Sequence, residues 1–235
     1  MLKTPDRSSL VEQCTDTLRR AILSGDFAAG ERLPPERRLS DELQVNRVTL
    51  RAALGRLAAE GLLATRQGSG HTVQDFRQAG GPSILPGLTE LAEEQGRLGE
   101  VVSDLLRVRR HLALAALELI AARRPDPTPV RDAVEAFAEA LDQGPDAVAE
   151  ADAAVLAAVL DATGSPVLAL CLNPVREVLG RCTPLRRAMF REPRGNLAGW
   201  QALVAWMEAP TAPPTLILGL LEERDAATLR AGGWA

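Results

Sequence analysis

Cysteine is scarce in this sequence, and histidine is scarcer still. The three cysteines stand far apart at positions 14, 171 and 182, without a CxxC pair, and there are two histidines. An odd number of scattered cysteines does not build a disulfide scaffold, and this spacing is not that of a zinc site. We therefore expect reduced thiols, as in a cytoplasmic protein.

Long hydrophobic runs and aromatic side chains are lacking as well. The most apolar stretches, 153–160 and 166–172, fall well short of the roughly 18 residues that span a bilayer. The start of the chain has no apolar segment of the kind found in secretory signals, and we expect no membrane segment. Aromatic residues make up 3% of the chain, so Ala, Leu and Val must form the core, which favours packed helices.

The net charge of −4 conceals an uneven distribution. Residues 1–76 carry 11 basic and 10 acidic side chains, whereas residues 77–235 carry 16 basic and 21 acidic ones. Seven arginines lie within residues 32–66, against four acidic residues. A local basic face matters more for contact with phosphate than the overall charge does, so this part of the chain is the candidate for nucleic-acid binding.

Residues 1–76 show the element order of a winged helix-turn-helix. Apolar residues at helical spacing predict three helices, over residues 9–24, 35–43 and 47–60. Asn46 is suited to cap the third helix and Gly61 to end it. Two short strand-like runs, 62–66 and 71–73, flank a glycine-rich tip and predict a β-hairpin, the wing.

Beyond residue 76 the pattern is helical, with breaks at glycine and proline. Helices are expected over residues 84–95, 99–124, 128–142, 146–163, 166–181, 195–207 and 213–230. We therefore predict a mainly α protein, with a DNA-binding domain at 1–76, a linker at 77–87 and an all-helical bundle at 88–235 for ligand binding and dimerisation.

The third predicted helix carries residue types that contact base edges. In a helix-turn-helix the second helix enters the major groove, where arginine bonds to guanine and threonine or valine can meet a thymine methyl group. Arginines on the preceding helix can reach phosphates. Alternatively, these arginines form an ordinary solvated face. The residues expected to contact DNA are Arg37, Arg38, Arg47, Val48, Thr49 and Arg51, with Gln67, Gly68 and His71 from the wing.

Three groups of residues resemble the GntR family of bacterial repressors, without gaps over about residues 18–73. They are a G-x-x-L-P-x-E-R-x-L pattern from Gly30, the recognition helix after Asn46, and the wing sequence R-Q-G-S-G from Arg66. The resemblance implies a homodimer that binds near-palindromic double-stranded DNA. It also implies operator contacts at Arg37, Arg47, Thr49, Arg51 and Gly68.

The sequence departs from this family at one position of the recognition helix. The second residue of that helix is often Thr or Ser in the family and is Val48 here. The loss of the hydroxyl removes one phosphate or base contact, and it can shift the preference toward a thymine methyl group.

The helical region resembles, more loosely, the FCD class of effector domains, and most of all its FadR-type branch, which responds to fatty acyl-CoA. The resemblance rests on residues 73–76 with 81–85, on 104–109 and on 152–168. It implies a small-molecule effector, a fatty acyl-CoA or a small organic acid, bound within the helical domain.

Many FCD domains hold a divalent metal with one aspartate and three histidines. Asp152 is present here, but the histidine positions align with Leu156, Trp200 and Glu223. Imidazole is the natural ligand for a transition metal in such a site, and none is available. We therefore expect no metal and no other cofactor.

Four residues of the helical domain are candidates for effector contact, namely Arg109, Asp152, Leu156 and Trp200. Arg109 can pair with an anionic ligand or, alternatively, form a salt bridge with Asp104 or Glu118. The alternative role of Asp152 is a buried hydrogen bond. Leu156 and Trp200 are equally compatible with core and with a pocket wall.

These patterns predict a cytoplasmic, ligand-responsive transcriptional repressor. A second interpretation is a DNA-binding regulator whose helical domain only dimerises. A third is an enzyme fused to a DNA-binding domain. The sequence contains no Ser-His-Asp set, HExxH, Walker A loop or GxGxxG motif, so we do not expect an enzyme.

Overall fold

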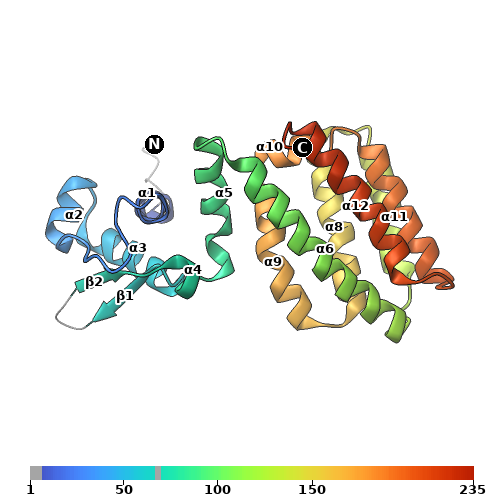
Figure 1. Cartoon of the computed structure of the whole chain (residues 1–235), viewed down its shortest axis with the longest axis horizontal. Coiled ribbons are helices and arrows are strands. Elements are labelled where there is room, and N and C mark those ends of the chain that lie inside the picture. The colour runs from blue at the N-terminus through green and yellow to red at the C-terminus, as the bar shows by residue number, and fades with distance from the viewer. Residues whose placement is uncertain (1–6, 67–69) are drawn as a thin grey trace, which may run out of the picture. The chain divides into compact units, whose positions relative to one another are not determined.

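Short helices and a two-stranded hairpin form the first part of the chain (Figure 1). The computed structural model describes residues 7–66 and 70–235. Its first elements are α1 (Arg7–Ser24), α2 (Glu36–Glu42), α3 (Arg47–Ala59), β1 (Leu63–Arg66), β2 (Gly70–Val73), α4 (Phe76–Ala79), the 3-10 helix η1 (Pro82–Ile84) and α5 (Leu85–Glu94). β1 pairs antiparallel with β2, with Leu63 opposite Val73. This is the winged helix-turn-helix that the sequence predicts.

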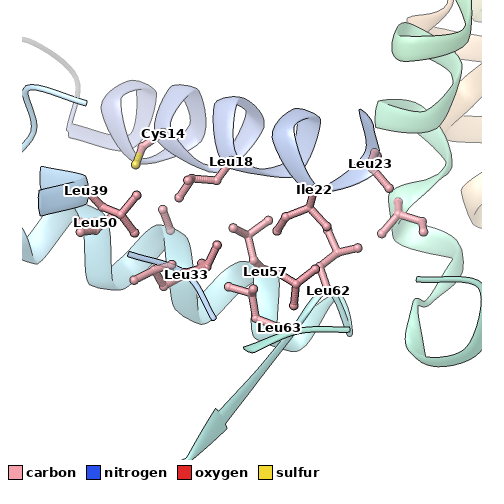
Figure 2. Packing of buried hydrophobic residues seen from close by; sticks show 14 of the residues in the cluster. Cys14, Leu18, Ile22, Leu23, Leu33, Leu39, Leu50, Leu57, Leu62 and Leu63 are labelled. Carbon is pink, nitrogen blue, oxygen red and sulfur yellow. The ribbon is translucent and has the colours of Figure 1, made fainter. Parts of the chain in front are cut away.

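Aliphatic side chains from α1 and α3 form the core of this first unit. Leu18 and Ile22 point from α1 toward Leu57 on α3 (Figure 2), and all three are buried. Cys14, Leu18 and Ile22 follow one another at four-residue intervals, which places them on one face of the helix. Because α3 buries the face with Leu57 against α1, its opposite face is exposed to solvent.

The segment 77–87, expected to be a linker, folds against the first unit. Ile84, at the end of η1, is apolar and joins its core, as does Leu91 on the following helix α5. Gly61, with a φ of +78°, ends α3 where α4 comes close, and a Cβ at this position would lie 2.0 Å from the carbonyl oxygen of Ala79. The two compact units of the chain are Met1–Leu91 and Ala92–Ala235.

The second unit consists of packed helices. They are α6 (Leu98–Arg123), α7 (Thr128–Ala140), α8 (Pro145–Thr163), α9 (Pro166–Arg181), α10 (Thr183–Met189), α11 (Pro193–Glu208) and α12 (Pro214–Ala231). The long helix α6 packs against α8, α9 and α12, and α7 packs against α8 and α11. The sequence predicts all of these except α10, which begins directly after the backbone leaves helical geometry at Cys182.

Phe137 and Trp206 belong to the core of the second unit. Phe137 is fully buried, and Trp206 is 5% exposed, with its Nε1 donating to the carbonyl oxygen of Ala212 at 2.8 Å. Trp206 is therefore a core residue. Among the described helices, none combines the length and apolar character that crossing a bilayer requires.

Candidate nucleic-acid interface and ligand cavity

The start of α3 presents three of the predicted contact residues to solvent. Arg47 is exposed, Val48 is 79% exposed and the side chain of Arg51 is 69% exposed. Asn46 caps this end of the helix, because its Oδ1 accepts a hydrogen bond from the backbone N–H of Thr49 at 2.8 Å. The side chain of Thr49 differs from the other three, since it is only 9% exposed and lies on the buried face of α3.

Glu36 connects the recognition helix with the wing. Its Oε2 accepts from Nε of Arg51 at 2.7 Å, and its Oε1 lies 3.9 Å from Nε2 of His71. On the wing itself, Nδ1 of His71 and Oγ1 of Thr65 are 3.1 Å apart. An exposed ion pair contributes only about 0–1 kcal/mol, so an acceptor on DNA can take the place of Glu36 beside Arg51.

The predicted phosphate contacts lie on α2. Arg37 and Arg38 are both exposed, and Nε of Arg38 donates to Oε1 of Glu42 at 2.7 Å, one helical turn away. Exposed pairs of this spacing are worth about 0.3–0.5 kcal/mol, which leaves Arg38 available to a phosphate. Gln67 and Gly68 lie outside the described residues.

An apolar cavity of about 140 Å³ lies within the second unit. Leucines from α8, α9, α11 and α12 make up much of its wall. All four predicted effector residues line this one cavity. The polar side chains along the wall are Arg109, Asp152, Asn196, Trp200, Arg224 and Thr228. Arg224 and Asn196 are not among the residues predicted from the sequence.

Asp152 and Trp200 are joined across the cavity wall. Nε1 of Trp200 donates to Oδ1 of Asp152 at 2.8 Å. Burial raises the pKa of Asp152 above its ordinary value of 3.8, while the hydrogen bond from Trp200 and the positive charge of Arg109 act in the opposite direction. The alternative of a hydrogen-bonding role for Asp152 is therefore confirmed, and this residue also lines the cavity.

These residues do not fit a metal ion. Leu156 and Trp200 supply no lone pair for a metal, Oδ1 of Asp152 is engaged by Trp200, and Glu223 is exposed and away from the cavity. Within residues 7–66 and 70–235, no group of three or more His, Cys, Asp or Glu residues is placed to hold a metal.

Arg109 forms its ion pair with Asp225 of α12. Nη2 of Arg109 donates to Oδ1 of Asp225, and Nη1 of Arg110 donates to Oδ2 at 2.8 Å. Asp225 is 1% exposed, so this pairing is buried between α6 and α12. The predicted salt bridge of Arg109 with Asp104 or Glu118 is wrong, because both of these acidic residues are exposed to solvent whereas Arg109 faces α12.

Two arginine groups at the cavity have unused donors. In the described part of the chain, the buried Nε–H groups of Arg109 and Arg224 have no hydrogen-bond partner. Nη2 of Arg224 donates to Oδ1 of Asn196 at 2.7 Å and to the carbonyl oxygen of Glu192 at 3.3 Å. An unpaired buried donor costs about 1–3 kcal/mol, and more for a charged group, so each arginine would gain from an acceptor.

A second cavity of about 280 Å³ adjoins the first and shares Asp152 and Leu156 with it. Arg176 and Arg186 lie along its wall. Nη2 of Arg186 is 3.4 Å from Oδ1 of the exposed Asp146. The wall of this second cavity therefore carries two basic side chains together with the acidic Asp146, Glu150 and Asp152.

A winged helix-turn-helix with an exposed recognition helix, followed by a helical unit that encloses a cavity, defines a class of DNA-binding transcriptional regulators. Residues 10–73 match the family of bacterial regulatory proteins of the gntR type, and residues 104–211 match the FCD domain. The chain belongs to the GntR family and carries an FCD effector domain.

Two relatives are similar over most of their length. The fatty acid metabolism regulator protein of Edwardsiella ictaluri is 33% identical over 76% of this chain and 72% of its own. An uncharacterised HTH-type transcriptional regulator of Mycobacterium tuberculosis is 34% identical over 77% and 72%. The family and these relatives are transcriptional regulators, so this chain is a regulator and not an enzyme.

A solved structure shares the fold. It is described as "Lar controls the expression of the Listeria monocytogenes agr system and mediates virulence". It superposes with a TM-score of 0.62, covers 98% of both chains and is 15% identical. At this identity the likeness supports the architecture alone.

Proposed function

We propose that this chain is a cytoplasmic repressor that binds a near-palindromic operator as a homodimer. A small effector in the cavity of the FCD domain then controls its affinity for DNA. The effector must bind one arrangement of the dimer better than the other, because a ligand with equal affinity for both shifts nothing.

The outward placement of Arg47, Val48 and Arg51 carries the DNA-binding part of this proposal. These side chains start a helix that is capped by Asn46 and anchored in the core by Leu50 and the residues behind it. A rigid helix with an exposed, basic amino-terminal end matches the way in which a helix-turn-helix enters the major groove.

The cavity supports the effector part of the proposal. Its wall is mainly apolar, and two of its six polar side chains are arginines, which suits an acidic molecule with an aliphatic chain. The relatives named as fatty acid metabolism regulators agree with a fatty acyl-CoA or an organic acid. A domain that only dimerises is the alternative.

Arg47→Ala tests the interface. The operator is first selected from random duplexes with the full-length chain, and affinities are then measured at fixed salt. Arg47→Ala is expected to lose about 1–3 kcal/mol of specific binding. Arg107→Ala, which removes an exposed arginine from α6, is the matched control and should bind normally. If Arg47→Ala binds the operator as tightly as the wild type, the recognition helix is misplaced.

The same assay tests control by an effector. Octanoate or octanoyl-CoA, added to the wild-type chain on its operator, is expected to change the measured affinity for DNA. If neither molecule changes it, the helical domain serves dimerisation, and the effector part of the proposal fails while the DNA-binding part stands.

A further inference from the structure

The polar wall of the first cavity offers two charged donors and little negative charge to meet them. We propose that this cavity binds the free carboxylate of a short- or medium-chain aliphatic acid, with its oxygens accepting hydrogen bonds from the guanidinium groups of Arg109 and Arg224, the two arginines that line it. The CoA thioester of such an acid is then not the form that occupies it. This inference rests on the proposed role of the cavity as the effector site.

The charges along the wall favour an anion. Arg109 and Arg224 are the cationic side chains there, and Asp152 is the one acidic residue among the described lining residues. Burial raises the pKa of Asp152, so its negative charge is disfavoured in this environment. Asp225 lies behind the wall and pairs with Arg109 and with Arg110, whose Nε also lies 3.7 Å from Oε1 of Glu222. Among the described residues, no carboxylate forms a salt bridge with Arg224, so the excess positive charge of the wall lies there.

Both guanidinium groups are held in place before any ligand arrives. Asp225 holds Arg109, while Asn196 and the Glu192 carbonyl oxygen hold Arg224. Arg224 also packs against Gly195, where a Cβ would lie 2.3 Å from its Nη1. Donors fixed in this way lose little conformational freedom on binding, which favours specific recognition of a small anion.

The volume of the cavity limits the size of its ligand. About 140 Å³ is less than the roughly 300–1,000 Å³ of typical pockets for drug-sized ligands. The first cavity therefore suits a short aliphatic acid, and the bulk of a CoA group has to lie elsewhere. The CoA group of a thioester bound in the first cavity would extend into the adjoining cavity, whose wall includes Arg176. Substitution of Arg176 is therefore expected to affect binding of the thioester and not binding of the free acid.

Isothermal titration calorimetry on the full-length chain compares three eight-carbon probes: octanoate, 1-octanol and octanoyl-CoA. Octanoate and octanol share the chain and differ in the charged group, so octanoate is expected to bind roughly 10- to 100-fold more tightly. Octanoyl-CoA is expected to bind more weakly than octanoate. Equal binding of octanol and octanoate, or tighter binding of octanoyl-CoA, overturns the inference.

Two matched pairs of variants locate the carboxylate. Arg224→Gln is expected to lower the affinity for octanoate roughly 10- to 100-fold and to leave octanol unchanged, whereas Arg176→Gln leaves octanoate binding intact. Gly195→Ala, which displaces the Arg224 guanidinium while keeping its charge, should also weaken octanoate. Its control is Gly219→Ala, since a Cβ there meets nothing within 4 Å. Normal octanoate binding by both Arg224→Gln and Gly195→Ala overturns the assignment.

The outcomes separate this inference from the proposed function. Binding of octanoyl-CoA that depends on Arg176 and not on Arg224 refutes the free-acid ligand but retains an effector site. Failure of all three probes to bind refutes both the inference and the effector part of the proposed function. Operator affinity, measured on the same preparations, tests the DNA-binding part independently.

Discussion

The two units of this chain use arginine in opposite ways. The arginines of α2 and α3 are exposed, lie close together in the sequence and pair with exposed or half-buried carboxylates such as Glu36 and Glu42. The arginines of the cavity are largely buried, come from α6 and α12, and are held by Asp225 or Asn196. Exposed pairs exchange partners readily, whereas a buried cation must keep an acceptor.

This difference suits two kinds of ligand. A DNA duplex is large and polyanionic, so the protein needs only an exposed face with rotatable charges. A small acid has to be enclosed, and its site has to be assembled from helices that are distant in the sequence, as Arg109 and Asp225 are with a separation of 116 residues. The comparison predicts that the two units respond separately to substitution.

The largest expected effect comes from truncating either core. Leu57→Ala in the first unit should cost about 2–5 kcal/mol of unfolding free energy, and Phe137→Ala in the second about 3–5 kcal/mol. All three tryptophans, at 200, 206 and 234, belong to the second unit. Tryptophan fluorescence should therefore report a lower unfolding midpoint for Phe137→Ala and an unchanged one for Leu57→Ala, whose loss appears in far-UV circular dichroism.

A single transition that both variants shift equally, in both signals, would show that the units unfold together. The two units would then differ in the ligands that they bind but would unfold as one cooperative structure.

Asn46 allows stability and DNA binding to be separated within the first unit. Asn46→Ala should lower its unfolding free energy by about 1 kcal/mol, because the cap on the Thr49 N–H is lost. Asn46→Asp keeps the cap but places a negative charge next to Arg47. It should retain the thermal midpoint of the wild type and bind operator more weakly. Operator binding that follows stability alone in both variants would remove α3 from the interface.

The smallest expected effect concerns Asp152 and depends on pH. The pKa of Asp152 is raised in the folded chain, so the folded state holds the proton more tightly than the unfolded state does. The resulting contribution to the free energy of unfolding is fully present at low pH. It is lost as the pH rises above 3.8 and through the folded pKa. In Asp152→Asn the introduced amide does not ionise and keeps an oxygen for Trp200 Nε1. The thermal midpoint of this variant minus that of the wild type should therefore become more positive as pH increases from about 4 to 7.

Asp161→Asn, an exposed change on the same helix, is the control for the effect of pH. A difference between Asp152→Asn and the wild type that stays constant over this range would contradict the buried, desolvated state of Asp152.

The first unit could be predicted from the sequence because its determinants are local. Asn46 and Gly61 mark the ends of α3 within one or two residues, and the spacing of apolar residues separates its buried face from its exposed one. The burial of Thr49 is the exception, since it follows from packing and not from its position at the start of the helix.

The cavity could be predicted only in part because its polar residues meet through tertiary packing. Arg224 and Asp225 follow two glutamates, and a run of charged residues reads as a solvated helix face. The sequence does contain one indication of the position of Arg224. Residues 217, 221, 224 and 228 are three or four positions apart, so Arg224 lies on the same helix face as Ile217, Leu221 and Thr228. The pairing of Asp225 with α6 has no counterpart in local sequence. Helix α10 was missed because it starts immediately after α9 ends.

The contribution of α12 to the cavity has a consequence for synthesis on the ribosome. This helix supplies Ile217, Leu218, Leu221 and Arg224, so one wall is missing until translation has passed these codons. The core of the winged helix-turn-helix is complete by Leu91. Because domains generally fold as units from the amino terminus during synthesis, a nascent chain can acquire its DNA-binding fold well before it can enclose a ligand.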